Sequence, residues 1–337
     1  MLKPSASPWL LGLKPPYGRV FKRGASSTPK MWETTFELEP IAPFRLDYTV
    51  WALKRRSVNL IDTLDGVVYR RVEDVDGQPV GVEVTQSGSP EEPRLKVKIV
   101  CAHSPTGAVE EEVEKRVIRL LGVKVDLAEF YRMAQGDPRL SQLVDAFLGV
   151  KPPRFPSLFE ALINAVACQQ VSLEVGLRLI SRLAERFGGR LVDAPGFTYS
   201  FPSARRIAEA PAASIRELGF SQRKVEVIKS LASAHLRGEL DDTRFESMAN
   251  PDVVRVLDAI KGIGRWSAEY VLLRGLGRLD VYPGDDVGAA RNLAAWLGVS
   301  GRLGYEEVQR ATSKWGRYRG VVYFHFLLRR LREKGVI

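Results

Sequence analysis

Two short runs of residues, separated by one helical stretch, have the types and spacing to act on a phosphate-bearing substrate. The first is Gly262-Ile263-Gly264, which is followed directly by Arg265. Glycines allow close backbone approach, and the N–H groups at a helix start bind anions. The second is the pair Asp285-Asp286, which follows the turn at Pro283-Gly284. A carboxylate there could stabilise positive charge on a sugar as its bond to a base breaks, or deprotonate the attacking water.

Each run also has a purely structural interpretation. A Gly-x-Gly turn between two helices can be an ordinary packing unit, and an aspartate at a helix start is most often an N-cap. The order of the runs favours chemistry. Lys261 and Arg265 flank the glycine turn and would contact phosphates together with Gly262, Ile263 and Gly264. Asp286 follows one helix later as the candidate catalytic carboxylate.

Aromatic and amide side chains extend this pattern. Trp266 and Tyr270 stand four residues apart on one face of the predicted helix, where an extruded base could stack, and Tyr282 is a further candidate for that pocket. Most of the other aromatic side chains at helical spacing are predicted to be core. Gln169 and Gln170 end an apolar helix. They either satisfy backbone groups at the helix end or form a wedge that fills the gap left by a flipped nucleotide.

The composition suits a nucleic-acid partner. The 337 residues include 50 Lys and Arg against 40 Asp and Glu, which gives a net charge of +10. Residues 1–30 carry basic but no acidic side chains and are predicted to be a flexible basic arm. Two cysteines exclude a four-cysteine cluster or a disulfide framework. No apolar run is long enough to cross a membrane, so an intracellular, cytoplasmic protein associated with the nucleoid is expected.

The elements that must position these residues divide the chain at about residue 106. Within residues 31–106, alternating β-branched runs with turns at Asp65-Gly66, Asp76-Gly77 and Ser87-Gly88 predict an antiparallel sheet. A helical pattern over residues 44–56 would cover it. Residues 107–337 are helical throughout, with a capping box formed by Ser157 and Glu160. The predicted fold class is α+β: an N-terminal antiparallel β-sheet domain with a helix, then an all-helical core of two lobes.

At this point the motifs resemble a known family. The run LDAIKGIGRWSAEYVLLRGLGRLDVYPGDDVGAAR is similar to the helix-hairpin-helix (HhH-GPD) DNA glycosylase superfamily, and most similar to its AlkA-type branch, the 3-methyladenine DNA glycosylases II. The resemblance also covers FPSLFEALINAVACQQVSLEVGLRLISRLAERFG and spans about residues 32–330. It implies a monomer whose helical part, residues 107–337, is an HhH-GPD glycosylase domain.

The resemblance assigns roles by position. Asp286 matches the catalytic carboxylate, Trp266 and Tyr270 match the base pocket, and Gln170 matches the wedge. Trp266 stands where relatives that cleave through a Schiff base carry a lysine, which implies no lyase activity. Leu327 stands where some members carry a pocket tryptophan. No cofactor is required, but the family binds a monovalent cation through hairpin carbonyls, here those of Asp258, Ile260 and Ile263.

The expected function is that of a monofunctional DNA glycosylase of base excision repair. It would flip a damaged base, an alkylated purine, out of double-stranded DNA, hydrolyse its N-glycosidic bond and leave an abasic site. A cationic purine would leave readily and stack on Trp266 and Tyr270 by cation–π attraction. Two alternatives remain open: a glycosylase for oxidised or deaminated bases, and a noncatalytic protein that binds DNA through the hairpin.

Overall fold

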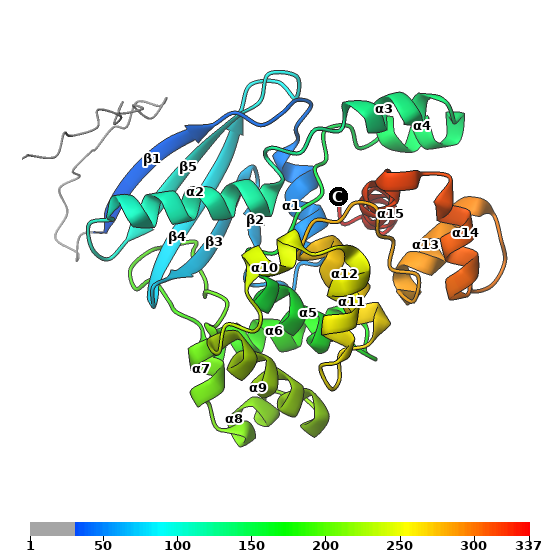
Figure 1. Ribbon diagram of the computed structural model, residues 1–337. Helices are drawn as coiled ribbons and strands as arrows, with labels where there is room; N and C mark the ends of the chain where they lie inside the picture. Colours follow the sequence, from blue (N-terminus) through cyan, green and yellow to red (C-terminus); the bar gives the residue numbers. More distant parts are fainter. Residues whose placement is uncertain (1–30) are drawn as a thin grey trace, which may run out of the picture.

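Five antiparallel strands open the part of the chain that the computed structural model describes, residues 31–337. The predicted arm at residues 1–30 lies outside the described residues. The strands pair in the order β1-β5-β4-β3-β2, as Figure 1 shows. Their bounds are β1 (Trp32–Leu38), β2 (Thr63–Asp65), β3 (Val68–Val75), β4 (Gln78–Ser87) and β5 (Arg94–Cys101). The predicted glycine turns at Gly66, Gly77 and Gly88 all have positive φ, which is the backbone conformation that glycine adopts without strain.

Two helices, rather than the single one expected, cover this sheet: α1 (Leu46–Lys54) and α2 (Gly107–Leu121). In Figure 1, α2 lies across the face of the sheet. Val113 and Val117 of α2 are buried in one core with Val84 and Val97 of the strands. This core extends to Val123, beyond the boundary expected at residue 106, because the apolar stripe of α2 needs the sheet to cover it.

The remaining helices form two lobes with separate cores. The first lobe is built around helices within residues 158–274, and the second around helices within residues 128–145 and 287–333, with Ala52 of α1 packed into it. The predicted α+β fold class is therefore confirmed. The bounds are α3 (Ala128–Gln135), α4 (Pro138–Asp145), α5 (Leu158–Cys168), α6 (Leu173–Phe187), α7 (Ala204–Glu209), α8 (Ala212–Glu217), α9 (Gln222–Leu236), α10 (Asp242–Ser247), α11 (Asn250–Asp258), α12 (Arg265–Arg274), α13 (Val287–Leu297), α14 (Tyr305–Ser313), the 3₁₀ turn η1 (Gly316–Tyr318) and α15 (Arg319–Glu333).

Serine side chains cap the N-termini of three helices in the first lobe, α5, α6 and α9. The Ser157 side chain accepts a hydrogen bond from the Glu160 N–H at 3.2 Å and starts α5 at the predicted residue. The predicted capping box is only half formed, because the Glu160 carboxylate contacts Arg71. Ser172 and Ser221 do the same for α6 and α9. Each cap satisfies a backbone donor that a helix start leaves without an intrahelical partner, so the sequence sets these boundaries locally.

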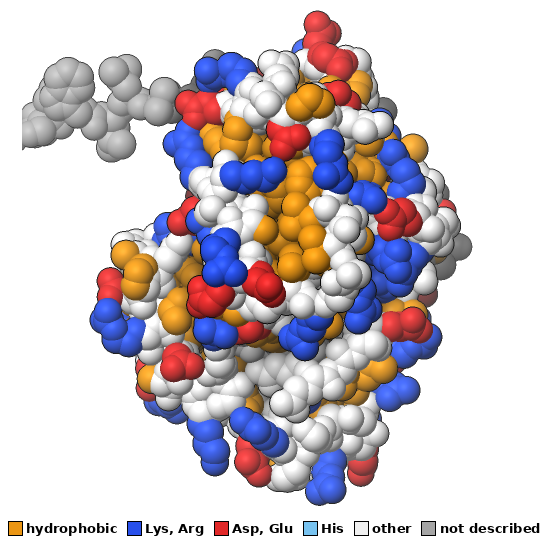
Figure 2. Space-filling model, turned by 90° about the vertical axis from the view of Figure 1, so that its right-hand side faces the viewer, with side chains coloured by type: hydrophobic (Ala, Val, Ile, Leu, Met, Phe, Trp, Pro, Cys, Tyr) orange, Lys and Arg blue, Asp and Glu red, His pale blue; other side chains and the backbone are white. Residues whose placement is uncertain are grey.

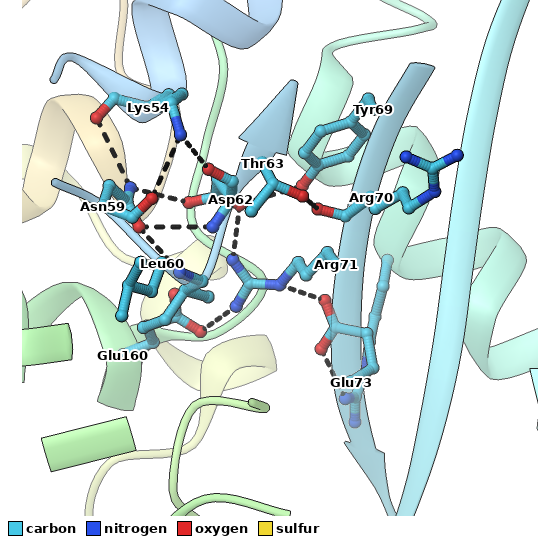
Figure 3. A network of polar contacts seen from close by, with 12 residues as sticks. Lys54, Asn59, Leu60, Asp62, Thr63, Tyr69, Arg70, Arg71, Glu73 and Glu160 are labelled. Atoms are coloured by element: carbon cyan, nitrogen blue, oxygen red, sulfur yellow. Dashed lines mark hydrogen bonds and ion pairs between the residues drawn. The ribbon is translucent and has the colours of Figure 1, made fainter. Parts of the chain in front are cut away.

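A buried ionic cluster joins the sheet to the first helical lobe. Arg71 of β3 is 2% exposed and contacts Asp62 at 2.8 Å, Glu73 at 2.5 Å and Glu160 of α5 at 2.5 Å (Figure 3). Arg116 of α2 adds a contact to Glu73 at 3.1 Å. Breaking a buried pair leaves an uncompensated charge, so the cluster holds the sheet and α5 in a fixed relation. Among residues 31–337, no helix combines the length and apolar character that a membrane span requires.

Candidate active site

A cleft of about 1240 Å³ lies between the two helical lobes. Its first wall comes from residues 168–173, the start of α9 and the turn between α11 and α12. Its second wall comes from residues 285–292 and the later turns of α15. Arg55 and Arg56, at the end of α1, complete the lining. Three parts of the chain that are far apart in sequence therefore meet at one cavity.

The two glycines of the hairpin serve different purposes. Gly262 has φ of 95°, and a Cβ added there would lie 2.3 Å from Cγ2 of Val227, so α9 packs against this bare backbone. Gly264 is extended, and a Cβ added there would meet nothing within 4 Å. Gly262 is thus required by the fold, whereas Gly264 presents an open backbone at the start of α12.

Gln169 and Gln170 are also separated by the structure. The Gln169 amide nitrogen donates to the Gly262 carbonyl at 2.8 Å and to Ser267 Oγ at 2.9 Å, so this side chain holds the hairpin in place. Gln170 is exposed and has φ of 53°, an uncommon conformation for a residue other than glycine. Gln169 therefore satisfies a backbone group, as the first interpretation predicts, whereas the wedge role of Gln170, which is exposed at the cleft rim, stays a prediction.

Asp286 lies half-buried in the cleft and caps α13. Its Oδ1 accepts the Ala289 N–H at 2.9 Å. Burial raises the pKa of Asp286 above its ordinary value, while hydrogen bonds from the Ala289 N–H, the Trp266 side chain and the Gly288 N–H oppose that rise. The carboxylate is therefore poorly solvated and held in a fixed orientation by its hydrogen bonds.

Asp285 has a different partner. Its carboxylate lies 2.7 Å from the Arg265 guanidinium, which stacks 3.7 Å from the centre of the Tyr305 ring. Tyr305 in turn donates to Glu269 at 2.7 Å. Asp285 therefore ties the start of α12 to the loop that carries Asp286. Arg265, expected at phosphates, is already ion-paired at the cleft edge.

Two of the three predicted pocket aromatics line the cleft. The Trp266 and Tyr270 rings lie 5.4 Å apart at 33°, next to each other along α12. Tyr282 does not line it: its side chain is 1% exposed and donates to the Ala289 carbonyl at 3.0 Å inside the second lobe. The residue precedes the buried turn before Asp286, so it supports the loop from behind. Leu327 lies on the wall contributed by α15.

Arg55 is a site residue that the sequence analysis did not identify. It is 3% exposed and donates from Nη1 to the Tyr270 hydroxyl at 2.8 Å and from Nη2 to Asn164 at 3.3 Å. Its partners are more than 100 positions away, so no local pattern connects them. The only sequence signal is the Arg55-Arg56 pair that ends the predicted helix over residues 44–56.

The cleft is strongly basic. Two carboxylates, Asp285 and Asp286, face eight basic side chains: Arg55, Arg56, Arg223, Lys224, Arg265, Arg291, Arg330 and Lys334. On the neighbouring face that carries α13 and α14, Lys and Arg side chains also surround a central hydrophobic patch (Figure 2). Such clustering attracts a polyanion and raises its local concentration.

The hairpin carbonyls sit at the C-terminal end of α11, where the helix dipole favours a cation. The Ile260 carbonyl accepts the Ile263 N–H at 2.9 Å. No described residue is found to donate to the carbonyls of Asp258 or Ile263. Lys261 is exposed on the hairpin, outside the cleft lining. Within residues 31–337, no cluster of three or more His, Cys, Asp or Glu side chains could hold a metal ion.

Comparison with known proteins places this geometry in context. A model of the HhH-GPD superfamily, described as base excision DNA repair protein, matches residues 163–317. DNA-3-methyladenine glycosylase of Bacillus subtilis is 29% identical over 64% of this chain and 71% of its own length. DNA-3-methyladenine glycosylase 1 of Schizosaccharomyces pombe is 30% identical over 52% of this chain and 73% of its own length. The solved 3-methyladenine DNA glycosylase of Archaeoglobus fulgidus superposes with a TM-score of 0.74 at 27% identity, over 88% of this chain and 99% of that one.

Proposed function

The chain belongs to the HhH-GPD superfamily of base excision DNA repair proteins, in its AlkA-type branch, and from this premise we propose that it is a monofunctional DNA glycosylase that removes an alkylated purine by hydrolysis. One observation carries the proposal. Asp286 lines a basic cleft together with Trp266, Tyr270 and the hairpin, which presents open backbone at Gly264. A base-flipping hydrolase would need a carboxylate, stacking rings and a phosphate contact, so this arrangement supports the proposal.

Asp286 is the proposed catalytic carboxylate. Cleavage of the glycosidic bond builds positive charge on the sugar, and a fixed anion in a water-poor site stabilises it more strongly than water would. Oδ1 accepts the Ala289 N–H, and an ionised carboxylate has further acceptor sites, so the group could also face the sugar or accept a proton from the attacking water. The capping bond fixes the orientation of the carboxylate before substrate arrives.

Hydrolysis without strand cleavage is proposed because Trp266 cannot form a Schiff base. A combined glycosylase and lyase needs a nucleophilic amine at the sugar. Lys224, the lysine on the first wall of the cleft, donates its Nζ to the Ala167 carbonyl at 2.9 Å and is thus held away from that role. The product would then be an intact strand with an abasic site.

Double-stranded DNA is the proposed partner, bound by a monomer. The backbone at Gly262, Ile263 and Gly264 would contact a phosphate, with Lys261 and Arg265 beside it, and such contacts position DNA without reading sequence. Gln170 would fill the gap left by the flipped nucleotide, since it is exposed at the cleft rim. Gln169 would act by holding the hairpin.

A monovalent cation is proposed at the hairpin. The free carbonyls of Asp258 and Ile263, together with that of Ile260, fit an oxygen-preferring ion at the end of α11. Bound there, the ion would supply positive charge that bridges the hairpin to a phosphate. No other cofactor is proposed.

The substrate class follows from the relatives, two of which are named DNA-3-methyladenine glycosylase. The two rings on α12 would stack on any flat base.

A panel of duplexes, each with one defined alkylated, oxidised or deaminated base, tests the proposal by measuring free base. Release of an alkylated purine, with strand breaks only after hot alkali, supports it. Breaks without alkali, or a DNA adduct trapped by borohydride, would show a lyase, and no base release from any duplex would favour a noncatalytic binder.

A further inference from the structure

We propose that Glu269 and Tyr305 hold the aspartate loop, residues 283–286, in the position from which Asp286 acts. The inference rests on the proposed glycosylase function and adds two positioning residues to it, since neither side chain lines the cleft. It begins from a buried acid that the proposed mechanism leaves unused. Glu269 of α12 is only 8% exposed.

Both oxygens of the Glu269 carboxylate accept hydrogen bonds. Oε2 accepts the Gly284 N–H at 3.0 Å, and Oε1 accepts the Tyr305 hydroxyl at 2.7 Å. Gly284 belongs to the aspartate loop and Tyr305 opens α14, so one side chain joins the loop to two helices. Burial raises the pKa of Glu269, while these two hydrogen bonds oppose the rise. A buried carboxyl without partners is costly, so the bonds also keep Glu269 in place.

The Tyr305 ring packs directly on the backbone of the aspartate loop. A Cβ added at Gly284 would lie 2.6 Å from Cδ2 of Tyr305, so a larger residue there would displace the ring. The Arg265 guanidinium lies 3.7 Å from the centre of the same ring and 2.7 Å from the Asp285 carboxylate. Two consecutive loop residues are therefore restrained, Gly284 by Glu269 and Tyr305, and Asp285 by Arg265.

The turn passes these restraints on to Asp286. Its N–H donates to the Pro283 carbonyl at 3.2 Å, which closes the turn over the two restrained residues. Just before the turn, Gln309 of α14 donates from Nε2 to the Tyr282 carbonyl at 3.1 Å. The backbone from which the Asp286 carboxylate projects is thus fixed from α12 and α14, whereas the capping bond to the Ala289 N–H orients the side chain.

The position of this carboxylate matters more for the rate than for DNA binding. A fixed anion stabilises the positive charge that develops on the sugar without reorganising during the reaction. A displacement of about 1 Å that starts far from the reacting atoms can slow a reaction by roughly 10²-fold. Glu269 and Tyr305 lie outside the cleft lining, so their loss should leave the surface that receives DNA largely intact.

The test measures single-turnover base release against protein concentration, with the duplex of the lesion panel that is cleaved fastest. Glu269→Ala should lower the maximal rate by roughly 10²-fold and leave the half-saturating concentration close to that of the unaltered protein. Glutamine keeps an oxygen for the Gly284 N–H and can donate its amide to the Tyr305 oxygen, so Glu269→Gln should retain most of the rate.

Asp242 of α10 provides the matched control. It likewise accepts a backbone N–H, that of Leu158 at 3.0 Å, and contacts Arg119 at 2.7 Å, outside the cleft lining. Asp242→Ala should lower stability in urea unfolding and leave the maximal rate unchanged. Amide hydrogen exchange of a peptide spanning residues 281–288 should become faster in Glu269→Ala and not in Asp242→Ala.

Tyr305→Phe decides the matter if Glu269→Ala does not fold by circular dichroism. It keeps the ring on Gly284 and removes only the hydroxyl, so the maximal rate should again fall at an unchanged half-saturating concentration. An unchanged maximal rate in the folded variant, or an equal loss of rate in Asp242→Ala, overturns the positioning role and leaves the proposed function intact. No base release by the unaltered protein from any duplex overturns both.

Discussion

Asp286 Oδ1 accepts the Ala289 N–H at 2.9 Å, so the carboxylate assigned to catalysis is also the N-cap of α13. Position alone left these two roles as alternatives. The geometry allows both, because the capping bond uses only one of the acceptor sites of a carboxylate that lines the cleft. The capping bond also predicts how replacing Asp286 by a neutral residue should affect folding, separately from its effect on base release.

The acid side of the pH profile should report Asp286. Burial raises its pKa above the ordinary value, and the proposed mechanism uses the ionised form. Base release should therefore fall as pH decreases through a midpoint above that of a solvated aspartate. Single-turnover rates across the acidic range measure this midpoint. Asp285→Asn, which alters the carboxylate paired with Arg265, should keep the same midpoint. If the midpoint of this variant moved to the ordinary pKa of a solvated aspartate, the assignment of the acid limb to Asp286 would be contradicted.

The two neighbouring glutamines should separate in a stability measurement. Gln169→Ala removes the bonds to Gly262 and Ser267 and should lower the free energy of unfolding by about 1–3 kcal/mol. Gln170→Gly relieves a positive φ and should leave stability unchanged or slightly higher, while weakening extrusion of the base. Urea unfolding measures the first effect, and fluorescence of 2-aminopurine beside the lesion measures the second. Equal stability losses would contradict the division of roles.

The hairpin glycines provide a second matched pair. Gly262→Ala places a Cβ 2.3 Å from Val227 in a strained backbone and should destabilise the protein by more than about 1 kcal/mol. Gly264→Ala meets no protein atom and should fold normally. Its methyl group would still stand where a phosphate approaches, so DNA affinity should fall. Normal DNA affinity in Gly264→Ala would show that the backbone there is not a contact.

The cluster around Arg71 predicts how stability changes with pH. Burial raises the pKa of Glu160 to about 7, with Glu73 and Asp62 adding to the rise and Arg71 opposing it. Because the folded state then holds a proton that the unfolded state releases near pH 4.5, this carboxyl lowers stability as pH rises from about 4.5 to 7. Glu160→Gln should flatten that decline in urea unfolding. Glu91→Gln, at an exposed glutamate, should leave it in place.

Local patterns in the sequence predicted much of this molecule. Period-two alternation and glycine turns predicted the strands, and the capping box at Ser157 predicted the start of α5, because these features depend on neighbours a few positions away. The hairpin, Asp286 and the Trp266–Tyr270 face also meet in one cleft, as their order along the chain indicates.

Contacts between distant segments could not be predicted in this way. Arg55 reaches Tyr270 across 215 positions. Val113 and Val117 of α2 are buried against strands of the sheet, and the Tyr282 hydroxyl donates to the Ala289 carbonyl inside the second lobe. Gln169 bonds to Gly262 and Ser267, 93 and 98 positions away, whereas the adjacent Gln170 is exposed. Each of these is decided by tertiary packing.

The most direct test of the whole account is base release by Asp286→Asn. Asparagine caps a helix about as well as aspartate, so folding and DNA affinity should stay close to those of the unaltered protein. Asp286→Ala, which also loses the cap, should in addition cost about 1 kcal/mol of stability. Single-turnover release of an alkylated purine should fall by roughly 10²–10⁴-fold in Asp286→Asn. Release at the unaltered rate by the folded variant would contradict the catalytic role of Asp286.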